Sequence, residues 1–373
     1  MKILPAIAVA AALAATPALA DLLVPPSGDN QRATVSQKIG PVEVSIDYSS
    51  PRVTLKGDNR RGKIWGQLVP YGLVELSPTC PKCPWRAGAN ENTVFTVSSD
   101  VQVQGKPLPA GRYGLHMIPG KDEFTLIFSR NSSSWGSYSY DAAEDALRVT
   151  AKPAKSDYHE WLTYDFTERE PTRATVALKW EDLQVPFTVA VGNAPQLYVA
   201  GFREALRGAT GFDWHNLEAA AAYCLQNKVD LPEAERWAER AADPQAGGEE
   251  SFATLLLLSR AQEANGKADA ARATLEKALA SPAAGPLDLH QAGRQLLAAG
   301  KKEEALRIFQ ANAKRFPDRW PVHVGLMRGY AAMGDKARAL EEAHLAQKQA
   351  PDEANRKNLD SAIKSLEEGR KLD

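Results

Sequence analysis

The residues best suited to chemistry lie together in the loop at positions 80–92. Cys80 and Cys83 are separated by two residues in the segment CPKCP, a spacing at which one tight turn presents two sulfurs to each other or to a metal ion. If the chain is exported, a disulfide is the simplest interpretation; a zinc knuckle, a redox pair and free thiols are the alternatives. A zinc site needs four ligands, which the fold could supply only by bringing His116 and His159 to the two cysteines. We therefore predict a disulfide, no metal and no cofactor.

The segment WRAGANEN (residues 85–92) places an aromatic ring next to groups that bind anions. Arg86 could bind a carboxylate or a phosphate through two parallel hydrogen bonds, and the asparagines offer paired donors and acceptors. Glu91 could act as an acid–base group if it were buried. The structural alternative is that Arg86 and Glu91 pair with each other while the Asn and Gly residues form tight turns.

A histidine lies nearby in the strand-like segment YGLHMI, residues 113–118. Alternation along a strand places His116 on the same face as Gly114 and Ile118. A histidine among apolar residues is commonly a hydrogen-bonded core group, and a role as a ligand is the alternative. The candidate binding residues are therefore Trp85, Arg86, Asn90, Glu91 and His116.

Composition narrows the class of protein. The chain has 373 residues, of which 44% are hydrophobic and 24% charged, as in ordinary globular proteins. Its formal net charge of −1 does not favour nucleic acid or an anionic membrane surface as a partner. The sequence has no GxSxG elbow, no phosphate-binding P-loop, no HExxH helix and no dinucleotide fingerprint, which argues against the standard hydrolases and nucleotide enzymes.

Residues 1–20 are typical of a signal peptide. Lys2 supplies a positive charge, an apolar run extends from Ile3 to Ala15, and the segment TPALA that ends at Ala20 has the small residues that signal peptidase recognises. We expect cleavage near Ala20 and a mature chain in the periplasm or outside the cell. No later stretch is long and apolar enough for a membrane helix, so we expect no membrane span in the mature chain.

The strands that must position the loop at 80–92 are predicted from alternating hydrophobicity. Val42, Val44, Ile46 and Tyr48 alternate with polar residues, which is typical of a half-buried strand. Short strands separated by Gly, Pro and Asn turns then predict an antiparallel β-sandwich or barrel-like domain over residues 41–192, after a loose lead-in over residues 21–40. The later strands are expected at Thr93–Ser98, Val101–Gln104, Arg112–Ile118, Glu123–Ser129, Leu147–Ala151, Glu160–Phe166, Arg173–Trp180 and Val185–Val191.

The second half contains an internal repeat. Gly266, Gly300 and Gly334 are spaced by 34 residues, each is followed five positions later by Ala, and a Pro comes sixteen or seventeen positions after each Gly. This pattern resembles the tetratricopeptide repeat, in which Gly lies at the turn between two helices and Ala where helices cross closely. We expect a linker and a short helix over residues 193–211, then an α-helical tetratricopeptide-like solenoid over residues 212–373, with a polar closing helix at Ala354–Lys371.

The first half contains five ordered motifs: RGKIWGQLVPYG (61–72), WRAGANENTVF (85–95), LPAGRYGLHMIPG (108–120), WGSYSYDAAEDALRV (135–149) and HEWLTYDF (159–166). On these motifs it resembles the domain-of-unknown-function family 2911 (DUF2911). The resemblance covers nearly all of Val42–Val191, with an insertion at Leu73–Pro84 that carries the cysteine pair. It implies an exported β domain, followed in some members by helical repeats, and it brings no established catalytic residues.

These observations predict a multidomain β + α protein that acts by binding. The leading hypothesis is an exported binding or scaffolding protein of the cell envelope, whose repeats bind a protein partner and whose β domain binds a ligand or a second partner. The first alternative is a metal-dependent or acid–base enzyme with a pocket around Glu91 and His116. In the second alternative neither half has a small-molecule site, and both act as interaction surfaces.

Overall fold

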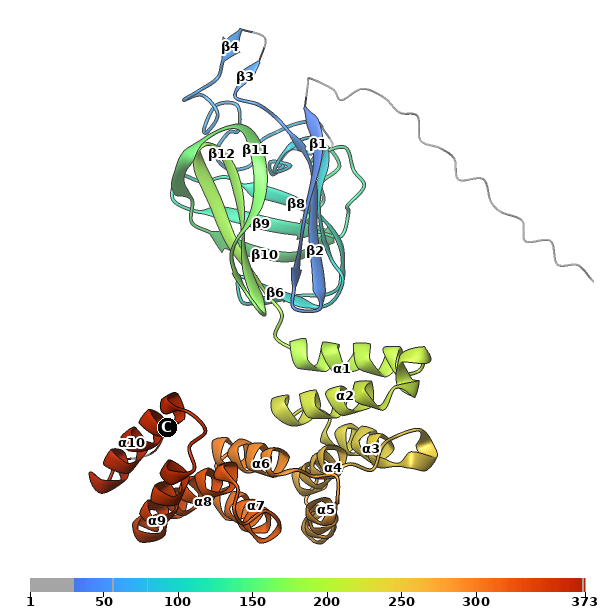
Figure 1. The fold of residues 1–373 in the computed structure, drawn as a ribbon. Coiled ribbons are helices and arrows are strands. Elements are labelled where there is room, and N and C mark those ends of the chain that lie inside the picture. Colours follow the sequence, from blue (N-terminus) through green and yellow to red (C-terminus); the bar gives the residue numbers. More distant parts are fainter. Residues whose placement is uncertain (1–29, 56, 79, 371, 373) are drawn as a thin grey trace, which may run out of the picture. The chain divides into compact units, whose positions relative to one another are not determined.

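The computed structural model describes residues 30–370 except Lys56 and Thr79, and also Leu372. The predicted signal peptide and the first part of the predicted lead-in lie outside the described residues. The chain divides into two compact units, the first ending at Ala194 and the second extending from Pro195 to Asp373. Each unit is described by itself (Figure 1).

The first unit consists of antiparallel β-sheets, as the sequence predicts. One sheet has the strand order β1-β2-β5-β8-β9-β10 and another the order β11-β12-β6-β7, and all neighbours pair antiparallel. Strands β3 and β4 form a small separate hairpin, and the described residues form no closed barrel. The strands are β1 (Gln31–Ile39), β2 (Val42–Ser50), β3 (Thr54–Leu55), β4 (Asp58–Asn59), β5 (Ala89–Val97), β6 (Val101–Val103), β7 (Lys106–Leu108), β8 (Gly111–Ile118), β9 (Phe124–Ser129), β10 (Asp145–Ala151), β11 (Ala154–Glu170) and β12 (Arg173–Ala190).

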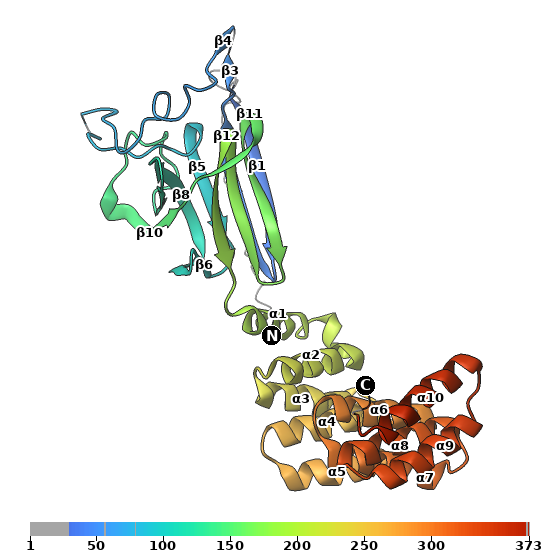
Figure 2. The same cartoon turned by 90° about the vertical axis from the view of Figure 1, so that its left-hand side faces the viewer.

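The core of this unit lies between the two larger sheets. Phe95 of β5 and Phe128 of β9 contact each other edge to face with ring centroids 5.1 Å apart. Both rings also contact Phe187 of β12, at 6.3 Å each, so that side chains of the two sheets interdigitate. Figure 2 shows the long β11–β12 hairpin on one side of this layer and β5 and β8 on the other.

Two sequence predictions for this unit need correction. Residues 31–39, expected within a loose lead-in, form β1, which pairs along its whole length with β2. Only Ile39 of β1 is fully buried, so this edge strand carries little of the hydrophobic alternation that reveals a strand. The strands expected at 173–180 and 185–191 are one strand, β12, in which Glu181 adopts a φ of 58° and the pairing with β11 shifts register. This irregularity accommodates polar residues in the middle of a long strand.

The second unit consists of paired antiparallel helices. Pairs α2–α3, α4–α5, α6–α7 and α8–α9 each pack closely, and α10 packs on α9. Gly266, Gly300 and Gly334 lie in the turns within three of these pairs with φ between 76° and 82°, a conformation that favours glycine. The helices are α1 (Ala194–Ala205), α2 (Trp214–Asn227), α3 (Leu231–Ala242), α4 (Phe252–Ala264), α5 (Ala268–Ala280), α6 (Pro286–Ala298), α7 (Lys302–Arg315), α8 (Trp320–Met333), α9 (Lys336–Lys348) and α10 (Glu353–Glu367).

The helical core follows the repeat. The alanines five positions after the turn glycines, Ala271, Ala305 and Ala339, are all buried, as expected for residues where helices cross. The segment expected as a linker with a short helix is mostly helix α1, which buries Val199 in the same cluster as Leu217 of α2. It is therefore the first helix of this unit. No helix of the described residues is long and apolar enough to cross a membrane.

Candidate functional site

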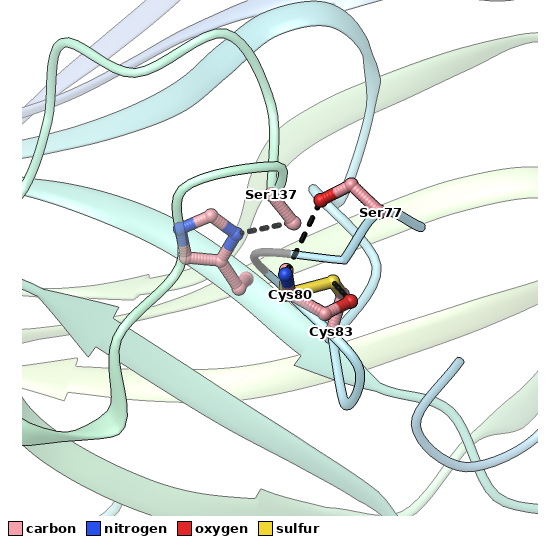
Figure 3. The surroundings of a disulfide bond; sticks show 5 residues. Ser77, Cys80, Cys83 and Ser137 are labelled. Carbon is pink, nitrogen blue, oxygen red and sulfur yellow. Dashed lines mark hydrogen bonds between the residues drawn. A yellow bond between two sulfur atoms is a disulfide. The ribbon is translucent and has the colours of Figure 1, made fainter. Parts of the chain in front are cut away.

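The two cysteines of the chemistry-rich loop are joined. A disulfide links Cys80 and Cys83 at the tip of a hairpin in which Val74 and Cys83 exchange two backbone hydrogen bonds of 3.0 and 2.7 Å (Figure 3). Both cysteines are buried. Because the linked residues are only three positions apart, the disulfide braces the hairpin locally and removes little chain entropy.

The weaker metal hypothesis is wrong for the cysteines, because disulfide sulfurs are not thiolate ligands. The two histidines proposed as further ligands lie on different strands: His116 is on β8, and His159 is on β11 opposite Glu181. Within the described part of the chain, no group of three or more His, Cys, Asp or Glu side chains is arranged to hold a metal ion.

Trp85 belongs to a cluster of aromatic rings at one end of the sandwich. Its backbone exchanges hydrogen bonds of 2.7 and 2.8 Å with Met117, which extends the sheet beside β8. The Trp85 ring stacks on that of Trp180 of β12, with centroids 6.4 Å apart and planes 13° apart. Trp65 packs edge to face against both rings, at 5.7 and 6.0 Å. Residues far apart in the sequence thus build one aromatic floor.

Arg86 and Glu91 contact different partners, so the predicted ion pair between them is wrong. Arg86 donates a hydrogen bond to the backbone carbonyl of Asn90, and its guanidinium lies 5.3 Å from the ring centroid of Tyr138. Glu91 accepts a hydrogen bond of 3.0 Å from Ser49 Oγ and lies 3.8 Å from Arg32.

The close packing around Arg86 explains a glycine. Gly136 has a φ of 61°, and a Cβ atom built on it would lie 2.2 Å from the central carbon of the Arg86 guanidinium. Any other residue would displace the arginine. The loop 135–138 therefore fixes where the Arg86 side chain lies.

His116 is a buried core residue. It is 2% exposed, its Nδ1 lies 2.9 Å from Ser137 Oγ, and its ring contacts that of Tyr140 edge to face. Burial, and to a smaller extent the nearby charge of Arg86, lowers the pKa of His116 from 6.5 to about 4. The imidazole is therefore neutral at neutral pH. Figure 3 draws Ser137 among the residues that surround the disulfide.

The asparagines of the loop have structural contacts. Asn90 adopts a φ of 56° and accepts a hydrogen bond of 3.1 Å from Asn30. Asn92 is buried and donates a hydrogen bond of 3.1 Å to the backbone carbonyl of Asn131. Both residues thus shape the backbone around Arg86.

A pocket of about 290 Å³ opens beside the aromatic floor. Trp85 and Arg86 are the two predicted site residues that line it. Asn90, Glu91 and His116 are not among its described lining residues, so the structure separates them from the pocket. The other polar or large apolar lining residues are Asn30, Arg60, Trp180, Leu68, Val69, Val74 and Leu76.

The sequence analysis missed Arg60 and Trp180, which come to the pocket from β-domain segments far from the loop at 80–92. No local sequence signal connects these two residues to the pocket. The structure itself exposes several large apolar residues in two short segments, namely Leu68, Tyr71, Leu73, Leu76, Trp135 and Tyr138. Exposed apolar residues that cluster in this way commonly mark a binding surface.

The helical unit has a groove of its own, with a volume of about 400 Å³. Its walls come from α2, α4 and α6, the first helices of three successive pairs. The groove has an apolar floor and a polar rim, with Phe252, Leu256, Glu218, Arg260, Gln291 and Gln295 among its lining residues.

The structural comparisons concern the helical unit. The structure is similar to MamA (13% identity, TM-score 0.29, covering 42% of this chain and 88% of that chain). It is also similar to a tetratricopeptide repeat protein from Parabacteroides merdae ATCC 43184 (15% identity, TM-score 0.29, covering 43% of this chain and 61% of that chain). A third similar structure is YrrB, described as a tetratricopeptide repeat protein with an unusual peptide-binding site (20% identity, TM-score 0.27, covering 45% of this chain and 84% of that chain). The helix pairs and the turn glycines spaced by 34 residues give the second unit a tetratricopeptide-like fold.

The comparison with protein families concerns the β unit. Residues 30–189 match the model of the family described as "Protein of unknown function (DUF2911)". This match confirms the resemblance carried by the sequence motifs, and it extends that resemblance to include β1. No curated protein sequence matches the chain.

Proposed function

We propose that this protein is an exported binding protein of the cell envelope, whose helical repeats bind a segment of a partner protein and whose β domain binds a ligand. One observation carries the partner-binding role. Three successive repeats contribute their first helices, α2, α4 and α6, to a single groove. Stacked repeats present such extended surfaces to partners.

The chemistry of the groove favours an apolar peptide segment with polar flanks. Phe252 and Leu256 supply an apolar floor, which gains free energy when a partner's side chains exclude water from it. Gln291 and Gln295 each offer amide donors and an acceptor, which can pair with the backbone of a bound segment.

The charges of the rim add direction. Glu218 of α2, Arg260 of α4 and Asp288 of α6 line the same groove, so Arg260 stands among acidic side chains. Opposite charges placed along a groove fix the orientation of a charged partner more than they add affinity. We therefore expect the bound segment to carry an acidic group where it meets Arg260.

The test is partner capture with a charge-reversal pair of variants. The full chain, immobilised and exposed to an envelope extract, should retain a specific partner that Arg260→Glu loses. Arg294→Glu is the matched control, because Arg294 is exposed on α6 and is not among the described residues of the groove. Equal retention by both variants, or no specific partner at all, would contradict the proposal.

Export is proposed on the leader-like sequence of residues 1–20 and is supported by the disulfide, because disulfides persist in oxidising compartments. The test is expression of the full chain in a Gram-negative host, followed by fractionation and N-terminal sequencing. We expect a periplasmic or extracellular chain that begins at Asp21. A cytoplasmic chain that keeps Met1 would reject export without bearing on the groove.

A further inference from the structure

We propose that the β domain's pocket binds a small organic carboxylate with an apolar body of about one ring. This inference gives a chemical class to the ligand in the proposed function. It rests only on the part of that function that assigns a ligand to the β domain. It does not depend on the groove of the helical repeats.

The charge of the pocket is one-sided. Arg60 and Arg86 both line it, and its described lining residues include no Asp or Glu. Arg60 donates to the backbone carbonyls of Val53 and Arg52, and Arg86 to that of Asn90. These acceptors are neutral backbone oxygens, so neither guanidinium charge is neutralised by these contacts. A guanidinium has five N–H donors, and a carboxylate is the acceptor that best fits its planar edge.

One of the lining residues, Trp180, carries a further hydrogen-bond donor. Trp180 is 1% exposed and lines the pocket, and its indole N–H has no acceptor in the described protein. Buried indole N–H groups usually have a partner. An occupant that carries oxygen acceptors fits such a pocket better than a pure hydrocarbon does.

The walls define the rest of the ligand. Leu68, Val74 and Leu76 line the pocket, and the stacked rings of Trp85 and Trp180 form its aromatic side. An apolar cavity of about 150 Å³ is large enough for benzene. The volume of about 290 Å³ therefore accommodates one ring together with a carboxylate group.

The disulfide hairpin holds part of this wall. Val74 and Leu76, which line the pocket, are hydrogen-bonded through their backbones to Cys83 and Cys80. The brace therefore fixes the wall before a ligand arrives. A preformed wall lowers the ordering cost of binding.

The test uses phenylacetate as the probe, with the purified full chain and ligand-observed NMR. Phenylacetamide, which keeps the ring and loses the charge, and acetate, which keeps the charge and loses the ring, are the two comparison compounds. We expect saturable binding of phenylacetate and binding at least about tenfold weaker for each comparison compound, which corresponds to about 1.4 kcal/mol.

Two variants locate the site. Leu68→Asp places a carboxylate in the wall and should weaken phenylacetate binding about tenfold through like-charge repulsion. Leu73→Asp is the matched control, since both leucines are exposed (46% and 43%) and only Leu68 is among the described lining residues. Both variants change exposed side chains, so both should fold, whereas Arg86→Gln would also disturb the loop at Asn90 and Tyr138.

Each outcome decides the proposal. Saturable binding that is lost in Leu68→Asp and kept in Leu73→Asp supports it. No saturable binding of phenylacetate, equal binding of phenylacetamide, or equal effects of the two aspartates would overturn it. Arg260→Glu, the groove variant, should bind phenylacetate normally, so failure of the pocket and failure of the groove give different results.

Discussion

The buried imidazole of His116 should make the stability of the β domain depend on pH in a defined window. In the folded chain the pKa of His116 is about 4, because burial in the layer under Ser137 and Tyr140 disfavours the charged form, and the charge of Arg86 opposes it as well. In the unfolded chain the pKa returns to 6.5. Between these values the unfolded state binds more protons than the folded state does. Stability is therefore complete above pH 6.5 and decreases as the pH falls towards 4.

The size of this change in the free energy of unfolding follows from the binding of one proton. A single group that is protonated only in the unfolded state changes the free energy of unfolding by about 1.4 kcal/mol for each pH unit. Between pH 6.5 and about pH 5 the β domain should therefore lose about 2 kcal/mol. This is a large part of the roughly 5–15 kcal/mol that stabilises a typical domain.

The measurement must report the β domain separately from the helices, because a two-unit chain need not unfold in one step. Hydrogen exchange with mass spectrometry, in urea at several pH values, gives the opening free energy of peptides from β5 and β8. His116→Gln, which cannot titrate, should lose this pH slope, whatever its absolute stability. His159→Gln is the control and should keep it. If His116→Gln kept the slope of the natural chain, another group would be responsible and the reasoning would be wrong.

Three further outcomes are expected, one for the cysteines and two for the helical unit. Burial raises the pKa of the Cys224 thiol to about 11, so this thiol should resist iodoacetamide in the native chain. After unfolding, one thiol should react in the absence of reductant and three in its presence. Three reactive thiols without reductant would contradict the disulfide. Gly300 has a φ of 78°, so Gly300→Ala should destabilise the helical unit by about 1–2 kcal/mol, measured by urea unfolding followed by circular dichroism. Gly201 lies on α1 with open space around it, so Gly201→Ala should stabilise the same unit by about 0.5–1 kcal/mol. Phe309→Ala should cost about 3–5 kcal/mol by the same measurement, because the ring is fully buried, and a loss below about 1 kcal/mol would show that it contributes little.

The helical half could be predicted well because its information is local. A turn glycine with a positive φ, a buried alanine five residues later and a proline after the second helix recur within each stretch of 34 residues. Helix pairs contact mainly their sequence neighbours, so the repeat in the sequence is the repeat in space. Only α1 was partly missed, because it lies before the first repeat and carries none of these signals.

The β half could be predicted less completely because its contacts are distant in sequence. The alternation at 42–48 predicted β2, whereas β1 is an edge strand with mostly polar, part-exposed residues and gave no such signal. For the same reason, only two of the five candidate residues line the pocket. Trp85 and Arg86 could be identified from their own segment, but Trp180 reaches the pocket only because β12 packs across the other sheet. No local sequence pattern predicts how the two sheets pack.

The same geometry bears on the alternative of acid–base chemistry at the loop 80–92. An acid–base pair needs two titratable groups that reach one reacting atom. Glu91 is turned towards Ser49 and Arg32, and His116 is buried against Ser137, and neither is among the described lining residues of the pocket. The pocket is instead lined by Arg60 and Arg86 together with the aromatic rings of Trp85 and Trp180. A guanidinium beside apolar rings suits the binding of an anion, which is why binding is the function proposed above.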